Sequence, residues 1–150
     1  MNLSIHSDEH FMKEALKQAE IGMMNKEIPV GAVIVCNNRI IARAYNQTET
    51  LNDSTAHAEM IALTAAFNYL GAKYLPDCSI YVTLEPCIMC AGALQWAQIG
   101  KLVYGASDRK RGYTMANSSI LHPKTKVIDG ILALDCKQKL DKFFNSIRNH

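Results

Sequence analysis

The sequence contains no apolar run that approaches the length of a membrane-spanning helix, so an integral membrane protein is not expected. Residues 1–10 are polar and lack the apolar core of a signal peptide. Only 5 of the 150 residues are cysteine, which does not suggest a disulfide framework. Repeats, linkers and low-complexity segments are also missing. We therefore expect one domain over residues 1–150, without membrane contact, in the reducing cytoplasm.

An excess of charge of one sign is absent as well, since the formal net charge is only +2. The placement of the charges is less even than their sum. Residues 101–126 contain one acidic residue, Asp108, among basic residues, and residues 137–148 are also basic. Such clustering can mark a nucleic-acid contact surface, although an ordinary solvated face gives the same pattern. The basic residues of the two segments are Lys101, Arg109, Lys110, Arg111, Lys124, Lys126, Lys137, Lys139, Lys142 and Arg148.

The sequence contains two short motifs whose residues could bind one metal ion. His57 and Glu59 form an H-x-E motif, and Pro86, Cys87 and Cys90 form a P-C-x-x-C motif. Together these motifs are the signature of zinc-dependent nucleobase deaminases. Three ligands leave tetrahedral zinc one open position for water, and Glu59 is placed to receive the proton of that water.

The sequence around the two cysteines explains how both could reach one ion. Residues 79–83 are β-branched and aromatic, which predicts a strand. Pro86 suits the first position of a helix that continues to about residue 97. Residues three apart share one face of a helix, so Cys87 and Cys90 can bind the same ion. The positive end of the helix also favours thiolates over thiols.

His57 is predicted at the start of a second helix. Asp53 and Ser54 are good N-cap residues, and residues 56–70 are rich in alanine, leucine and methionine. In the first turn of this helix, His57 and Glu59 could both lean over the helix end, because side chains tilt toward the N-terminus.

Two other interpretations of the cysteine pair are less consistent with the sequence. A redox pair gives no reason for His57 and Glu59. A structural zinc site needs a fourth protein ligand, and no candidate for it forms a second paired motif. These candidates are Cys36, Cys78, Cys136, His6, His10, His122 and His150.

Hydrophobic periodicity predicts the remaining elements. Helices are expected over residues 9–24 and from about residue 134, and strands over residues 30–35, 39–44, 101–105 and 127–128. Strand, helix and strand over residues 79–105 predict a parallel pair with a right-handed crossover. Residues 106–126 are expected to form a loop with one short helical turn near Ile120. We expect Trp96 to pack inside the protein.

Beyond the metal motif, the sequence resembles the bacterial tRNA-specific adenosine deaminases of the cytidine deaminase superfamily. The resemblance extends from about residue 11 to residue 144. The residues that carry it are Pro29, Val30, Gly31, Ala32, Asn46, residues 55–59, residues 81–93, Gly105, Ala106, Asp108, His122, Pro123 and residues 130–132. Residues 110–118 depart from the loop that is common in similar enzymes.

The resemblance implies a three-layer α/β fold of the cytidine deaminase type, with a mixed five-stranded sheet flanked by helices. It also implies a homodimer, one Zn²⁺ per subunit, and conversion of the wobble adenosine of a tRNA anticodon loop to inosine. The residue roles that it implies are zinc binding by His57, Cys87 and Cys90, proton transfer by Glu59, and substrate binding by Val30, Asn46, Ala58 and Asp108. Lys110 and Arg111 are candidate RNA contacts.

Two alternative functions remain open from the sequence. A deaminase of a free nucleobase or nucleoside, such as guanine, cytosine or cytidine, would share every zinc residue. A zinc-stabilised RNA-binding module without catalysis would share the ligands but would not need Glu59.

Overall fold

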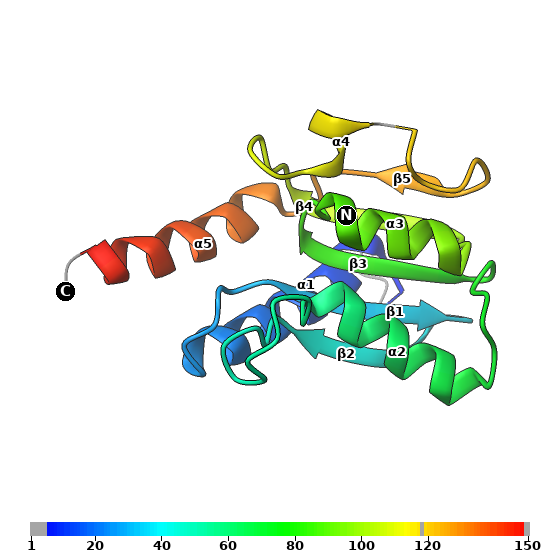
Figure 1. The fold of residues 1–150 in the computed structure, drawn as a ribbon, viewed down its shortest axis with the longest axis horizontal. Coiled ribbons are helices and arrows are strands. Elements are labelled where there is room, and N and C mark those ends of the chain that lie inside the picture. Colours follow the sequence, from blue (N-terminus) through cyan, green and yellow to red (C-terminus); the bar gives the residue numbers. More distant parts are fainter. Residues whose placement is uncertain (1–5, 118, 149–150) are drawn as a thin grey trace.

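The computed structural model describes residues 6–117 and 119–148, which form a five-stranded mixed sheet flanked by helices (Figure 1). The strand order is β2-β1-β3-β4-β5, in which β1 is antiparallel to β2 and β3, and β3, β4 and β5 are parallel. The sheet therefore confirms the predicted fold class. The strands are β1 (Gly31–Cys36), β2 (Arg39–Tyr45), β3 (Cys78–Leu84), β4 (Lys101–Ala106) and β5 (Lys126–Ile128).

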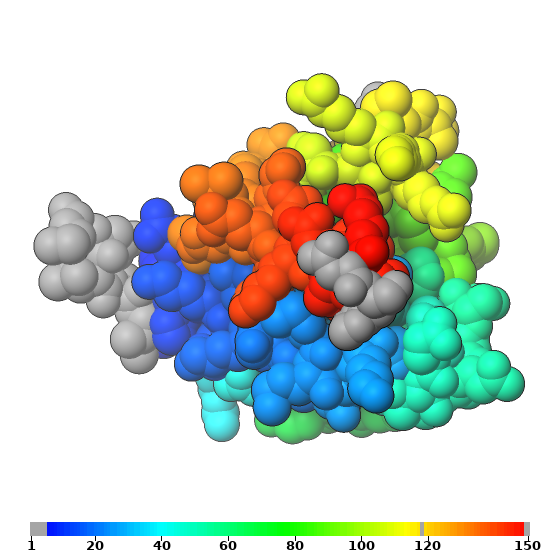
Figure 2. Space-filling model, turned by 90° about the vertical axis from the view of Figure 1, so that its left-hand side faces the viewer, coloured from blue at the N-terminus to red at the C-terminus, as the bar shows by residue number. Residues whose placement is uncertain are grey.

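Helices cover both faces of the sheet. α2 and α3 lie side by side on one face, and α1 and α5 contact the other (Figure 1). Figure 2 shows α5 beside α1, to which it is joined by an ion pair between Lys139 and Glu20. The helices are α1 (Asp8–Met24), α2 (Ala58–Leu70), α3 (Ile88–Ala97), α4 (Tyr113–Ala116) and α5 (Ala133–Arg148).

The central strands are mostly apolar, as expected for strands that are covered on both faces. Along β1, Ala32 and Ile34 pack beneath α2 and α3, whereas Val33 and Val35 face the opposite core and pack against α1. The two-residue period of a strand thus divides one apolar run between two cores. This packing holds α2 and α3 at fixed positions over the same face of the sheet.

Two predictions about individual elements are wrong. The short helix of the irregular segment spans Tyr113–Ala116 and does not lie near Ile120. Tyr113 is buried, and its N–H donates to Pro86 O, so tertiary contacts fix this turn. Trp96 is 79% exposed and contributes little to the core, because it lies on the outer face of α3.

Within the described residues, every helix is too short or too polar to span a lipid bilayer.

The backbone of α1 lies tightly against Gly31 at the start of β1, and this contact gives a test of the packing. We predict that Gly31→Ala lowers the free energy of unfolding by at least about 2 kcal/mol. An added Cβ would lie 2.0 Å from Ala15 O and 2.5 Å from Ala19 N, and backbone atoms cannot move aside locally. Urea denaturation would measure the change.

Gly92→Ala is the matched control, because an added Cβ at this position in α3 meets no atom within 4 Å. This variant should be neutral or up to about 1 kcal/mol more stable, as alanine favours a helix over glycine. Equal effects of the two substitutions would contradict the proposed packing.

Candidate active site

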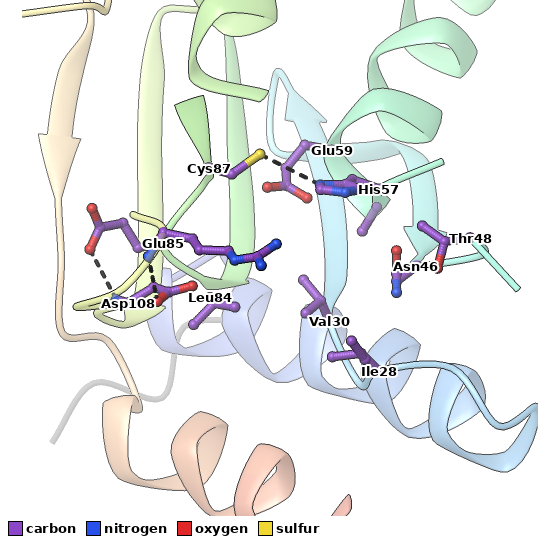
Figure 3. A pocket seen from close by; sticks show the side chains of 12 residues that line it. Ile28, Val30, Asn46, Thr48, His57, Glu59, Leu84, Glu85, Cys87 and Asp108 are labelled. Atoms are coloured by element: carbon purple, nitrogen blue, oxygen red, sulfur yellow. Dashed lines mark hydrogen bonds between the residues drawn. The ribbon is translucent and has the colours of Figure 1, made fainter. Parts of the chain in front are cut away.

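A pocket lies where the carboxyl ends of β2, β3 and β4 meet the first turns of α2 and α3 (Figure 3). The start of β1 completes it, because β1 runs in the opposite direction to its neighbours in the sheet. The lining residues are Ile28, Val30, Asn46, Thr48, His57, Ala58, Glu59, Leu84, Glu85, Cys87, Asp108 and Arg111.

Three potential metal ligands converge on one side of this pocket. His57 Nδ1 lies 3.6 Å from Cys87 Sγ and 3.5 Å from Cys90 Sγ, and the three donor atoms all lie within 4.8 Å of one another. Tetrahedral zinc with ordinary Zn–N and Zn–S bonds separates such atoms by about 3.6 Å. The donor set and its spacing therefore fit zinc with a fourth position left for a non-protein ligand. Among the described residues, no other group of His, Cys, Asp and Glu meets this criterion.

Two of the three ligands occupy equivalent positions at the starts of two helices. His57 is the N-cap residue of α2 and Cys87 that of α3, and neither side chain caps its own helix. Cys90 is the third residue of α3, a position that normally faces the N-cap side chain. The prediction of caps at Asp53 and Ser54 and of Pro86 as first helical residue is thus wrong by a few residues. Asp53 instead accepts hydrogen bonds from the N–H and hydroxyl of Thr55.

The three ligands share protons when no metal is bound. A hydrogen bond from Cys90, together with one from His57, lowers the pKa of Cys87 to about 4. The same Cys87 interaction, with burial, raises the pKa of Cys90, and the bond to Cys87 raises the pKa of His57. The neighbouring donors on Cys90 and His57 thus favour a thiolate at Cys87, and binding of a divalent cation to this set must release protons.

Glu59 lies beside the ligands, and its carboxylate points between Cys87 and His57 (Figure 3). Only 4% of this residue is exposed. Burial raises the pKa of its carboxyl group from 4.5 to about 7, with a further rise from the nearby Cys87 thiolate. A carboxyl group with a pKa near neutrality can both accept and return a proton at physiological pH.

The rest of the pocket contains most of the residues expected to contact substrate. Val30, Asn46, Ala58 and Asp108 all line it, and the N–H of Asn46 donates to Val30 O at 3.0 Å. Arg111 lines the pocket as well, whereas Lys110 is exposed outside the set of lining residues.

Sequence reasoning missed four lining residues, which are Ile28, Thr48, Leu84 and Glu85. Leu84 and Glu85 directly precede Pro86, so their closeness to the metal motif was a usable signal. Ile28 precedes a strand and Thr48 belongs to a polar loop, and neither residue type nor spacing distinguished them.

Fold and site together define a zinc-dependent deaminase architecture, with a Cys₂His ligand set beside a buried glutamate. The sequence model of the cytidine and deoxycytidylate deaminase zinc-binding region matches residues 5–106. The chain belongs to the cytidine and deoxycytidylate deaminase family.

Individual relatives confirm the more specific resemblance. The chain is 44% identical to the tRNA-specific adenosine deaminase of Rickettsia bellii over 92% of this chain and all of the relative. A solved structure from a study of A-to-I editing by tRNA:A34 deaminases at the wobble position is 40% identical, with a TM-score of 0.81, and covers 87% of this chain and 99% of its own. The guanine deaminase of Bacillus subtilis is also 40% identical, with a TM-score of 0.65, over 78% of this chain and 71% of its own.

The ligand geometry predicts the effect of removing single donors. His57→Ala and Cys90→Ser should each reduce bound zinc from about one ion per chain to near zero after dialysis against a moderate chelator. Cys36→Ser is the matched control, since Cys36 is half-buried at the far end of β1 and should leave the zinc content unchanged. Metal analysis of the purified variants would measure this. Full zinc occupancy in His57→Ala would contradict the assignment.

The raised pKa of Glu59 predicts a pH-dependent stability in the metal-free protein. Between pH 4.5 and about 7, the folded protein binds more protons at Glu59 than the unfolded chain does. The stabilisation of the folded state that comes from the protonated Glu59 is therefore present at low pH and is lost as the pH rises through about 7. We predict that Glu59→Gln matches the wild type near pH 4 and is more stable above about pH 7. Urea denaturation of both proteins after chelation would measure this. The same difference in unfolding free energy between wild type and variant near pH 4 and above pH 7 would contradict the prediction.

Proposed function

We propose that the protein is a zinc-dependent hydrolase that deaminates the wobble adenosine of a tRNA anticodon loop to inosine. The observation that carries this proposal is the full-length relationship to tRNA-specific adenosine deaminases, in which the Rickettsia bellii relative is matched over its whole length. The site supports it, because three ligand atoms and a buried glutamate meet in a pocket that opens to the surface. One domain over residues 1–150 carries both the metal and the substrate pocket.

His57, Cys87 and Cys90 would hold the zinc ion, which would acidify a bound water molecule and so supply a nucleophile at neutral pH. Glu59 receives the proton of the attacking water and delivers it to N1 of the adenine ring. The water oxygen adds to C6, and Glu59 then transfers the remaining hydroxyl proton to the amino group, which leaves as ammonia as the C6 carbonyl of inosine forms. Burial favours both steps, because a pKa near 7 makes proton uptake and release nearly equal in free energy.

The remaining lining residues hold the base. The Asn46 side chain faces the pocket and offers a donor and an acceptor for the edge of a purine (Figure 3). Val30 supplies an apolar surface, and the N–H of Ala58 lies in the first turn of α2, where it has no partner within the helix. These groups orient the ring so that C6 faces the metal side of the pocket.

RNA binding is supported by the charges at the pocket rim. Arg111 lines the pocket and Lys110 lies exposed beside it, so both can contact phosphates of a bound loop. The wobble base is already in a single-stranded context, so turning it into a pocket requires less free energy than extrusion from a duplex. Asp108 lines the same pocket, and we assign it a position near the flipped nucleotide.

Deamination of a free nucleobase is the second candidate, because the Bacillus subtilis guanine deaminase is 40% identical to this chain. The two candidates share the zinc ligands and Glu59. They differ in whether the rim of the pocket must contact an RNA backbone, and the basic residues near Arg111 favour RNA.

We further propose a cytoplasmic homodimer. An apolar groove between α2 and α3, lined in part by Phe67, Ala93 and Trp96, lies on the face opposite the sheet. The exposed Trp96 and Ile88 leave α3 with an uncovered apolar surface that a second subunit would bury. A monomer in sedimentation equilibrium at micromolar concentration would contradict the dimer.

The activity can be tested by measuring inosine in tRNA transcripts and ammonia release from free adenine, guanine, cytosine and cytidine. We predict inosine at the wobble position of a tRNA that carries A34, with a rate that falls steeply with salt. Glu59→Ala should retain zinc and tRNA binding but lower kcat by about 10²- to 10⁴-fold.

Activity confined to a free base would establish the second candidate and contradict the first. A wild type that binds tRNA but deaminates nothing, with Glu59→Ala indistinguishable from it, would identify an RNA-binding module.

A further inference from the structure

A second buried glutamate borders the pocket and takes no part in the proposed chemistry. Glu85 directly follows β3 and is 4% exposed. Its Oε1 accepts from Asp108 N at 3.0 Å, and its Oε2 accepts from Thr114 N at 3.0 Å and from the Thr114 hydroxyl at 2.7 Å. Among the residues that the structure describes, Glu85 forms no salt bridge, so these three donors stabilise its carboxylate.

The donors belong to both ends of one segment, residues 107–114, which we call the 107–114 loop. Asp108 and Arg111 of this loop line the pocket. The loop is compact around the carboxylate, because a Cβ on Gly112 would lie 2.2 Å from Glu85 Oε2 and 2.5 Å from Asp108 O. The turn inside the loop is local, since Asp108 Oδ1 accepts from the N–H groups of Lys110 and Arg111, each at 3.0 Å.

The loop is attached to the protein mainly through the chain around Glu85. Tyr113 N donates to Pro86 O at 2.9 Å, and Gly112 pairs with Cys87 in an isolated β-bridge. Without the carboxylate, two backbone N–H groups and a hydroxyl would lose their acceptor. The closed conformation of the loop would then lose the stabilisation that these charge-assisted hydrogen bonds provide, so the loop would open more often.

We propose that Glu85 is a positioning residue, whose carboxylate fixes the 107–114 loop so that Asp108 and Arg111 face the bound RNA. This inference rests on the proposed function, because it assigns Glu85 to the substrate side of the same site. Glu85 does not contact the reacting atoms, so its loss weakens substrate binding far more than the chemical step.

Glu27 provides a matched control. It is also fully buried, and it accepts from Glu49 N at 3.1 Å and from the N–H and hydroxyl of Thr50, each at 2.6 Å. Glu27 therefore resembles Glu85 in burial and in number of donors, but it holds residues 49–50 and not the 107–114 loop.

The first arm of the test does not depend on activity. Arg109, Lys110 and Arg111 are exposed, so trypsin can report how often the 107–114 loop opens in the folded holoenzyme. We expect Glu85→Gln to increase the rate of cleavage after these residues about tenfold, since glutamine cannot accept on both sides. Glu27→Gln should leave cleavage at these bonds at the wild-type rate.

The second arm measures kinetics on an anticodon stem-loop. Glu85→Gln should raise KM about tenfold while kcat changes less than about threefold and zinc remains at one ion per chain. Thr114→Val should give a smaller change in the same direction, and Thr114→Ser should restore wild-type behaviour because it keeps the hydroxyl. Gly112→Ala should reproduce the effect of Glu85→Gln, because the added Cβ would clash with the Glu85 carboxylate and push it away from its donors.

Several results would overturn the inference. These are wild-type proteolysis of Glu85→Gln, loss of zinc in that variant, a fall in kcat at constant KM, or equally fast loop cleavage in Glu27→Gln. If the wild type forms no inosine, the proposed function fails by itself. The proteolysis arm then still decides whether Glu85 holds the loop.

Discussion

The site depends on the meeting of two helix starts over one face of the sheet. α2 and α3 pack on the same apolar surface, and small residues such as Ala62 and Ala91 keep them close to the strands. Their first turns therefore meet at one edge, which places an imidazole nitrogen 3.5 and 3.6 Å from two sulfur atoms. A shift of either helix along the sheet would separate the ligands, so packing in the core sets the geometry of the metal site.

Buried carboxylates serve two different purposes around this centre. Burial by itself would raise the pKa of Glu27, but hydrogen bonds from Thr50 and Glu49 outweigh it and lower the pKa. Burial dominates at Glu59, whose pKa rises to about 7 beside the Cys87 thiolate. The number of donors thus separates a carboxylate that anchors a loop from one that is able to exchange protons.

The sequence was sufficient to single out the three residues whose donor atoms the structure brings together, because metal-binding motifs have a short, fixed spacing. Cys87 and Cys90 lie within one helical turn, and His57 lies two residues before Glu59, so local pattern was sufficient. The bonds between Glu85 and Thr114 join residues 29 positions apart, and no local pattern reveals such a pair. The exposure of Trp96 was also hidden, because helical periodicity does not show which apolar face the chain itself leaves uncovered.

Substrate choice must come from the pocket walls and not from the metal. The zinc motif is a property of the whole family, and a guanine deaminase at 40% identity has the same overall fold. A wall discriminates between substrates only when its polar groups are held in place before binding. Glu27 holds residues next to Thr48 on one wall, and Glu85 holds Asp108 and Arg111 on the other. Two anchored walls around one metal centre would allow this fold to change substrates through its loops while the ligands and Glu59 stay the same.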